Sequence, residues 1–417
     1  MLLPPDLRDW VADNELARLI LEAVELCDIR GAAVNLSGSG SAQYPPTMML
    51  AVLIYCYASG IFSSRRIERA TYDSVAVRYL CGNHHPDHDT IAHFRRQNGA
   101  LFKRCFATVV QLAREAGLLK LAAISIDGTR LAGAASKASV RTLEQIEAEL
   151  RELESQGAAL LLQAEAADQS DRDAGGTQLP PELADAQKRR EKLLAAKARI
   201  EERRRQAQEA GREDGPHSGR RTSKASVSEP ESRTLRPGGQ GSVQGYNAQL
   251  AVDAGQSGLI VGQYLSDEPG DYGLAGAGVA CVVAEAGQPT VALVDKGYEN
   301  SELFARVEQT HPIMILCPLR HRPNTKEGTA HRDNHRQHIF ALRQKMKARL
   351  AEPPLQELYR RRAVTVEPVF ARIKRHMGFS GLRCWGHQAA SAEWTLICLA
   401  HNLRMLTGKL LVRPTTA

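Results

Sequence analysis

The stretch KLAAISIDGTRLAG, residues 120–133, marks the point where the sequence changes from a helical to a strand-like pattern. Its apolar run of Leu, Ile and Ile ends at Asp127-Gly128, which predicts a buried strand followed by a turn. Residues 245–255 and 258–267 are also strand-like, and the Gly-Gln-Ser-Gly turn between them predicts a hairpin.

The strand pattern continues toward the C-terminus and alternates with helices. An Ala/Gly-rich helix is expected at 272–286, a strand within 289–300 that ends in Asp-Lys-Gly, and a short strand within 311–320. A basic, His-rich loop and two helices follow, and an apolar helix at 391–406 closes the chain. This order predicts a mixed α/β fold.

Residues 1–118 have a helical pattern. A buried helix is expected at 45–60, a helix capped by Ser63 or Ser64 at 63–80, and a long amphipathic helix capped at Asp89/Thr90 within 85–119. Short helices with arginines suit a DNA-docking module, in which Arg95 and Arg96 would contact DNA. A plain helical bundle has the same pattern, so both interpretations stay open.

Residues 137–240 interrupt the strand pattern. Apolar residues recur at alternating spacings of three and four, with a break at Gly157 (Leu143, Ile146, Leu150, Leu153 and, after the break, Leu160). A basic second helix at 183–210 runs back. The segment therefore predicts an inserted helical (coiled-coil) hairpin with a basic loop, serving as an architectural arm or a solvated spacer. The predicted domains are 1–118, 119–136 with 241–410, the insert 137–240 and a tail at 411–417.

Composition limits the protein class. The chain has 417 residues and a formal net charge of +7, and its length predicts two or three domains. Eight scattered cysteines without a CxxC pair indicate free thiols in a reducing compartment. The longest apolar run, 48–62, is too short for a membrane span, and the N-terminus lacks a signal-peptide pattern. We expect a cytoplasmic protein without a membrane partner.

Three acids occupy positions that suit a metal site. Asp127 and Asp295 each end an apolar strand, where open sheets build their sites. Glu367 precedes Pro368, which is tolerated in a first turn or at a kink. The pattern predicts a helix that begins near Thr365, with the glutamate at the edge of the core. Such an oxygen-only site suits Mg²⁺ or Mn²⁺.

Cations surround this glutamate in the sequence. Three arginines precede it, at 360, 361 and 362, and Arg372, Lys374 and Arg375 follow it. Carboxylates alone would repel phosphates, whereas these cations attract them. The stretch therefore indicates nucleic acid as the partner and metal-dependent phosphodiester chemistry as the reaction.

These motifs resemble those of bacterial insertion-sequence transposases of the DDE class. The similar stretches are SIDGTRLAGAASK, GYNAQLAVD, VDKGYEN, YRRRAVTVEPVFARIKRHMGF and the N-terminal helices. The resemblance implies a ribonuclease-H-like catalytic domain with Asp127, Asp295 and Glu367 as metal-binding catalytic acids. It also implies that Tyr359, Arg362 and Lys374 of the Y-R-E-K signature contact phosphate. Arg362 lies five residues before the glutamate, one more than the strict spacing.

The resemblance further implies how such a protein acts. It would bind terminal inverted repeats and target DNA as a homodimer in a synaptic complex. It would cut each end by hydrolysis and join it by transesterification. Three alternatives remain: a metal-dependent nuclease without strand transfer, a transposase-derived DNA-binding protein without catalysis, and a recombinase with Tyr298 as covalent nucleophile.

Two smaller motifs also allow more than one reading. Asp271 is either the N-cap of the helix that follows it or a further acid near the site. Trp385 and Trp394 are expected in the core. The histidines at 84, 85, 88 and 93 suit a polar turn better than a zinc site, because no cysteine accompanies them.

Overall fold

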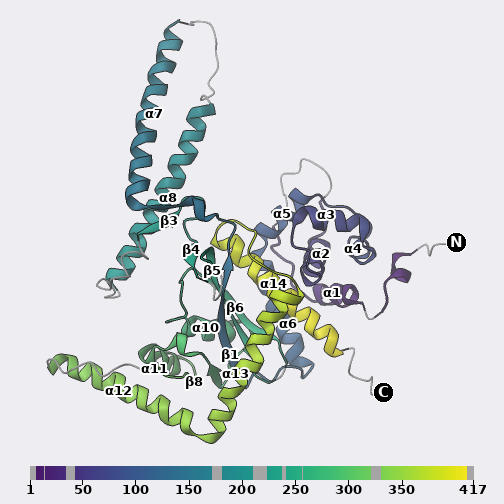
Figure 1. Cartoon of the computed structure of the whole chain (residues 1–417). Helices are drawn as coiled ribbons and strands as arrows, with labels where there is room; N and C mark the ends of the chain where they lie inside the picture. The colour runs from purple at the N-terminus through teal and green to yellow at the C-terminus, as the bar shows by residue number, and fades with distance from the viewer. Residues whose placement is uncertain are drawn as a thin grey trace. The chain divides into compact units, whose positions relative to one another are not determined.

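In a computed structural model of the chain, the described residues are 6–13, 15–33, 43–170, 181–209, 223–236, 241–255, 257–320 and 330–410 (Figure 1). The chain divides into two compact units. The first comprises residues 1–131, 247–384 and 388–417, and the second comprises 132–246 with 385–387. None of the described helices is long and apolar enough to cross a membrane.

The first unit begins with helices. They are a 3₁₀ turn Leu7–Trp10, α1 Leu16–Glu25, α2 Pro46–Ala58, α3 Ser64–Asp73, α4 Val75–Leu80, α5 His88–Gln97 and α6 Gly99–Glu115. The predicted helices exist, but two of them are split. Ser74 ends α3 and caps α4 through Val77 N, and Asn98 separates α5 from α6. Asp87 caps α5, not the predicted Asp89/Thr90, because its carboxylate accepts the Thr90 N–H at 2.8 Å.

This unit also contains a mixed sheet. Its strands are β1 Ala123–Ala132, β5 Val243–Asp253, β6 Ile260–Ser266, β7 Val291–Leu293 and β8 Met314–Leu316. These strands follow the order β5-β1-β7-β8, and β6 pairs with β5; the sixth strand of the sheet, β4 Arg233–Leu235, pairs with the part of β5 that belongs to the second unit. The β5–β6 pair is the predicted hairpin, and β1, β7 and β8 are parallel. This mixed α/β architecture is consistent with the expected ribonuclease-H-like fold.

The remaining helices of the unit are α10 Ala275–Glu285, α11 Ser301–Thr310, α12 Ala330–Ala351, α13 Pro353–Ala371, a π-helical turn Arg372–His376 and α14 His387–Leu410. Two predicted boundaries are wrong. The strand β1 continues past Asp127 to Ala132, and α13 begins 12 residues before Thr365, at Pro353. Pro368 therefore lies inside a helix, four residues before the start of the π turn. The apolar residues that follow Thr365 at helical spacing predict a buried stripe; Val366, Ile373 and Met377 are buried, whereas Phe370 is only half-buried.

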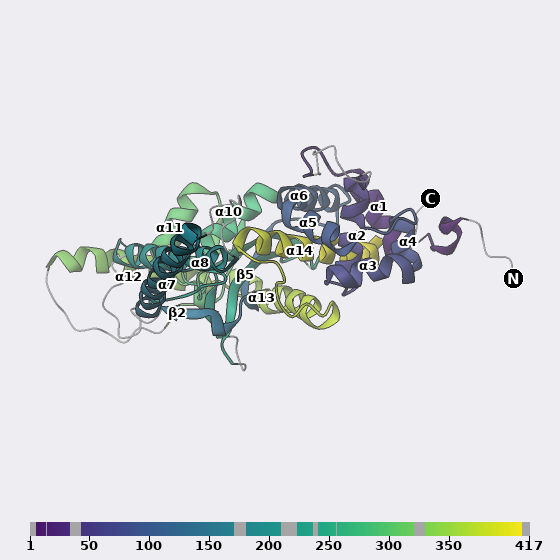
Figure 2. The ribbon, with the colours of Figure 1, turned by 90° about the horizontal axis from the view of Figure 1, so that it is seen from above.

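A buried carboxylate joins α14 to the N-terminal helices. Glu393 is fully buried and accepts hydrogen bonds from Tyr57 Oη at 2.8 Å, Arg383 N at 2.6 Å and Cys384 N at 3.0 Å. Arg95 Nη1 donates to the same Tyr57 hydroxyl at 2.9 Å. Figures 1 and 2 both show α14 beside α2. The N-terminal helices and the closing helix thus share one core.

The second unit contains the predicted helical hairpin. Its elements are a 3₁₀ turn Lys137–Ser139, β2 Val140–Thr142, α7 Leu143–Ser170, α8 Pro181–Glu209, β3 Lys224–Ser226 and β4 Arg233–Leu235. The core of the hairpin includes Ile146, Leu150, Leu193 and Ile200, as the spacing predicts. The side chain of Leu160 lies outside the described residues. The domain boundaries proposed from the sequence remain predictions.

The two tryptophans have different environments. Trp394 on α14 is fully buried, and its indole donates to Gln249 O at 3.0 Å, which confirms a core position. Trp385 is 55 % exposed, so its predicted core position is wrong. It lies in the short segment before α14, where Gly386 has a left-handed backbone with φ +83°.

Candidate active site

The register of two parallel strands brings the predicted aspartates to neighbouring positions. Ser125 of β1 pairs with Leu293 of β7, and each acid lies two residues further along its strand direction. Asp127 remains within β1, whereas Asp295 follows β7 and caps the 3₁₀ turn Lys296–Tyr298 through the Gly297 N–H. Both acids therefore lie toward the carboxyl ends of adjacent parallel strands.

The Asp127 carboxyl has an unusual environment. Its pKa is raised to about 6, mainly by burial and to a smaller extent by the neighbouring Asp295 and Asp271, while Arg362 and the Gly128 N–H oppose the rise. Arg362 Nη2 lies 2.9 Å from Asp127 Oδ2, and the two side chains are only 11 % and 21 % exposed. The site is therefore a pocket of negative charge with one arginine directed into it.

Asp271 is the third acid of this pocket. Its Oδ1 accepts hydrogen bonds from Asn247 Nδ2 at 2.8 Å and Gln249 Nε2 at 3.0 Å. Tyr298 Oη donates to the carbonyl end of the Gln249 carboxamide at 2.5 Å. The N-cap position of α10 is Leu274, so Asp271 does not cap that helix with its side chain.

The helix α13 contacts β1 through several side chains. Tyr359 Oη donates to Val294 O at 3.2 Å, and Thr365 Oγ1 lies 2.7 Å from Ser125 Oγ. Beyond the helix, in the π turn, Lys374 Nζ donates to Thr129 Oγ1 at 2.5 Å. Three of the four Y-R-E-K positions thus face the two strands that carry the aspartates.

Glu367 is the exception. It is exposed, and among the described residues it has no hydrogen-bond or ion-pair partner, so its predicted position at the edge of the core is wrong. The reason is helix geometry: Thr365, Val366 and Val369 face the core, and at 3.6 residues per turn position 367 falls outside their stripe, on the flank that also carries Lys374.

The structure places two of the three predicted acids, Asp127 and Asp295, on neighbouring parallel strands. Among the described residues, no three carboxylate, histidine or cysteine groups are close enough together to hold a metal ion. The donor set nevertheless fits a hard divalent cation, because Asp127, Asp271 and Asp295 present only oxygen atoms. Asn247 and Gln249, which support Asp271, were missed by sequence reasoning. Their spacing of two along a strand was the available signal, since it places both on one face.

The predicted DNA-contacting cations differ in exposure. Arg96 and Arg375 are exposed, and Arg372 is half-buried. Arg95 is only 7 % exposed, and its Nη1 donates to Tyr57 Oη and to Phe62 O at 2.8 Å. Its assignment to DNA binding is corrected: this guanidinium satisfies buried acceptors inside the helical core.

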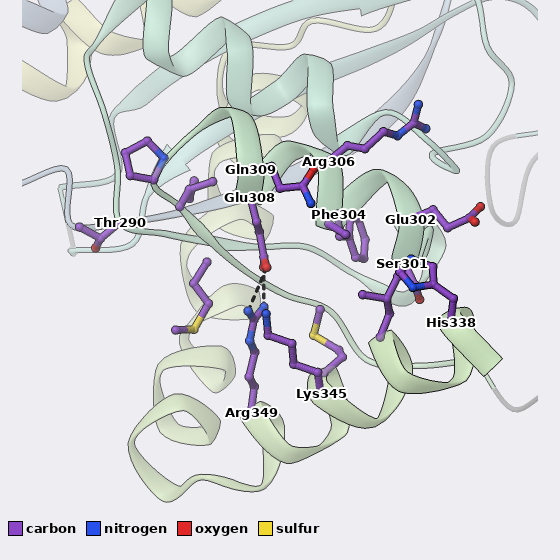
Figure 3. Close-up of a pocket in the computed structure, with 16 residues that line it drawn as sticks. Thr290, Ser301, Glu302, Phe304, Arg306, Glu308, Gln309, His338, Lys345 and Arg349 are labelled. Atoms are coloured by element: carbon purple, nitrogen blue, oxygen red, sulfur yellow. Dashed lines mark hydrogen bonds and ion pairs between the residues drawn. The ribbon is translucent and has the colours of Figure 1, made fainter. Parts of the chain in front are cut away.

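A cavity of about 1040 Å³ lies elsewhere in the first unit, between α11, β8 and α12 (Figure 3). Arg349 Nη2 donates to Glu308 Oε2 across it at 2.9 Å. None of the acids described above lines this cavity. The cavity is therefore not part of the candidate active site. The Glu308–Arg349 ion pair links α11 to α12.

Comparison with protein families covers both ends of the chain. Residues 5–97 match a family model described as a transposase domain (DUF772), and residues 292–407 match one described as a transposase DDE domain. The second match spans Asp295 and the whole of α13. Comparisons with curated proteins and with solved structures give no match. Enzymes of the DDE class act on DNA with divalent metal ions. The chain belongs to the insertion-sequence transposases of the DDE class, which cleave DNA and transfer its strands.

Proposed function

We propose that Asp127, Asp295 and Glu367 are the catalytic acids with which this transposase cuts and joins the ends of its insertion sequence, using Mg²⁺ or Mn²⁺. The observation that supports this most is the pairing of β1 with β7, which makes the two aspartates neighbours. The Arg362–Asp127 ion pair ties the glutamate-bearing helix to them.

The roles of the acids follow from their environments. When bound, divalent ions activate the attacking oxygen and stabilise the leaving oxygen of the phosphodiester. Asp127 and Asp295 hold them from the strands, and Arg362 balances the Asp127 charge before the site is loaded. Glu367 would contribute its carboxylate from α13. This carboxylate is exposed and has no hydrogen-bond or ion-pair partner among the described residues, so it is available to a divalent ion.

The cations around the acids hold the DNA backbone. Lys374, Arg372 and Arg375 follow the glutamate on one continuous helical segment, and Tyr359 and Arg362 precede it. We assign phosphate contacts to all five. The N-terminal residues 1–118, with Arg96 exposed on α5, would bind the terminal inverted repeats. Two ends must be cut and joined together, so the acting form is a homodimer in a synaptic complex.

The test uses labelled DNA that carries the sequences flanking the gene. Wild-type protein, Glu367→Gln and the control Glu357→Gln are incubated with Mg²⁺ or with EDTA. Glu357 is an exposed acid on the same helix, paired with Arg360. We expect metal-dependent cleavage and joined products from wild type and the control, and a loss of ~10³-fold or more from Glu367→Gln.

The aspartates extend the test. Asp127→Ala and Asp295→Ala should also abolish cleavage while binding to end DNA persists. Equal loss of binding in all three acid variants would indicate a structural role instead. DNA binding without cleavage in every lane would contradict the catalytic proposal, and cleavage without joined products would contradict strand transfer.

A further inference from the structure

One guanidinium spans the turn that carries Asp295. Arg320, in the segment that follows β8, donates from Nε to Lys296 O and from Nη2 to Gly297 O, both at 2.8 Å. These two carbonyls belong to the 3₁₀ turn that Asp295 caps through the Gly297 N–H. A 3₁₀ turn of three residues has few backbone hydrogen bonds of its own. The planar fork of the guanidinium therefore fixes the peptide groups next to the acid.

Arg320 is itself held through both of its backbone polar groups. Its N–H donates to Glu299 Oε2 at 2.6 Å, and its carbonyl accepts from Arg343 Nη2 at 2.6 Å. Arg343 Nη1 forms an ion pair with Glu299 Oε1. The side chains of Glu299 and Arg343 are only 1 % and 18 % exposed. A largely buried ion pair thus fixes the backbone of an exposed arginine and ties α12 to the turn.

The backbone just before the turn is fixed as well. Tyr359 Oη donates to Val294 O at 3.2 Å, and Cys317 Sγ lies 3.3 Å from Asp295 O, within hydrogen-bond distance. Together with the two contacts of Arg320, each of the four consecutive carbonyls at 294–297 has a side-chain donor. The acid is therefore carried on a backbone whose position is over-determined, which is typical of a preorganised catalytic position.

We propose that Arg320 is a positioning residue for Asp295. Glu299 and Arg343 hold Arg320 in the conformation that does this. The inference rests on the proposed function of Asp295 as a catalytic acid. In the described part of the chain Arg320 forms no ion pair with the Asp295 carboxylate, so it acts through the backbone of the turn and not as a counter-ion.

The test exchanges Arg320 for lysine in the full-length protein. Arg320→Lys keeps the positive charge but replaces the rigid fork with a single ammonium group, which does not reproduce the two parallel hydrogen bonds. We expect the single-turnover rate of DNA-end cleavage at saturating DNA and Mg²⁺ to fall about 10- to 100-fold, the range found when a group that supports a metal ligand is removed. The dissociation constant for end DNA should stay near the wild-type value.

Arg306→Lys is the matched control. Arg306 lies on α11, is exposed, and has no hydrogen-bond or ion-pair partner among the described residues, so its exchange should leave cleavage unchanged. A wild-type cleavage rate in Arg320→Lys would overturn the inference. Weaker DNA binding by Arg320→Lys, with a wild-type rate once DNA is saturating, would show that Arg320 contacts a phosphate instead and would overturn it as well.

A second measurement separates positioning from a general loss of structure. Hydrogen exchange followed by mass spectrometry reports on the turn, where Gly297 N–H donates to the Asp295 carboxylate and Tyr298 N–H to Asp295 O. In Arg320→Lys we expect faster exchange at 295–298 and unchanged protection in the buried helix α2. Unchanged exchange at 295–298, or a loss of protection that includes α2, would overturn the positioning role.

Asp295→Ala separates this inference from the proposed function. If Asp295→Ala abolishes cleavage and Arg320→Lys does not slow it, the inference is overturned and the proposed function stands. If Asp295→Ala cleaves DNA as fast as wild type does, the proposed function fails, and the inference fails with it.

Discussion

The strand side and the helix side of the active site are built in different ways. The strand side consists of Asp127, Asp271 and Asp295, and buried carboxamides and backbone N–H groups hold its acids in place. The helix side consists of the Y-R-E-K residues, and its acid, Glu367, is exposed and has no partner among the described residues. In our proposal, this difference means that the acids on the strands are held in place before DNA and metal bind, and that Glu367 completes the site afterwards.

The largest expected effect is on the strand side, from Gly128→Ala. The new Cβ would lie 2.7 Å from Asp271 Oδ1 and 2.8 Å from Asn247 Oδ1, so the network must shift. We expect a loss of about 1–3 kcal/mol in unfolding free energy, as in other overpacked interiors, together with loss of cleavage. Denaturant unfolding and the DNA cleavage assay measure the two effects.

Gly270→Ala is the matched control for this change. It adds the same methyl group next to Asp271, but no atom lies within 4 Å of the new Cβ. Stability and cleavage should both stay near wild type. A Gly128→Ala protein that is as stable and as active as Gly270→Ala would show that the strand side is not rigid.

An intermediate effect is expected where the two sides meet, from Arg362→Gln. The guanidinium competes with cations for Asp127, so its removal should tighten Mn²⁺ binding to the DNA-free protein. A coupling of about 1.5 kcal/mol, the low end for close charge pairs, corresponds to roughly tenfold. Calorimetry measures the affinity. Arg361→Gln removes an exposed charge one residue away and should have no such effect. Weaker Mn²⁺ binding by Arg362→Gln, or an equal gain in Arg361→Gln, would contradict the competition.

The smallest effect is expected from Lys374→Ala on the helix side. Its ammonium contacts Thr129 and, in our proposal, one DNA phosphate. DNA-end binding should weaken several-fold, and the slope of log affinity against log salt should fall by about 0.9, while Mn²⁺ affinity is unchanged. Lys347→Ala on α12 is the control for an exposed lysine. A salt slope identical to wild type would argue against the phosphate contact.

The strand side was largely predictable from the sequence. Apolar runs that end in Asp-Gly and Asp-Lys-Gly identify β1 and β7, and parallel pairing then brings Asp127 and Asp295 together. Asp271 was recognised only as an alternative to a helix cap. Its partners lie 22 and 24 residues away on β5, and one sequence contains no information about which distant side chains share a hydrogen bond.

The helix side was less predictable, because tertiary contacts and solvent exposure outweigh the local sequence signals for helix ends and exposed side chains. Proline inside a helix removes the N–H that would bond to the carbonyl four residues before it. At Pro368 that carbonyl belongs to Val364, which is 72 % exposed, so water can satisfy it and α13 continues. Arg95 is a second residue whose environment the local sequence pattern does not predict. Its helix has an ordinary amphipathic pattern, but acceptors from Tyr57 and Phe62 draw the side chain inward.

The buried Glu393 has a consequence for the evolution of such enzymes. Of the groups that donate to this buried carboxylate, Tyr57 comes from a helix at the opposite end of the chain, and its hydroxyl donates to Oε1. Exchanging residues 6–118 for those of another element would remove that donor and leave one oxygen of a buried carboxylate without it. We therefore expect the N-terminal helices and the catalytic part of the chain to change together during evolution. New specificity for DNA ends should arise by point substitutions on exposed helix faces, not by exchange of the whole N-terminal segment.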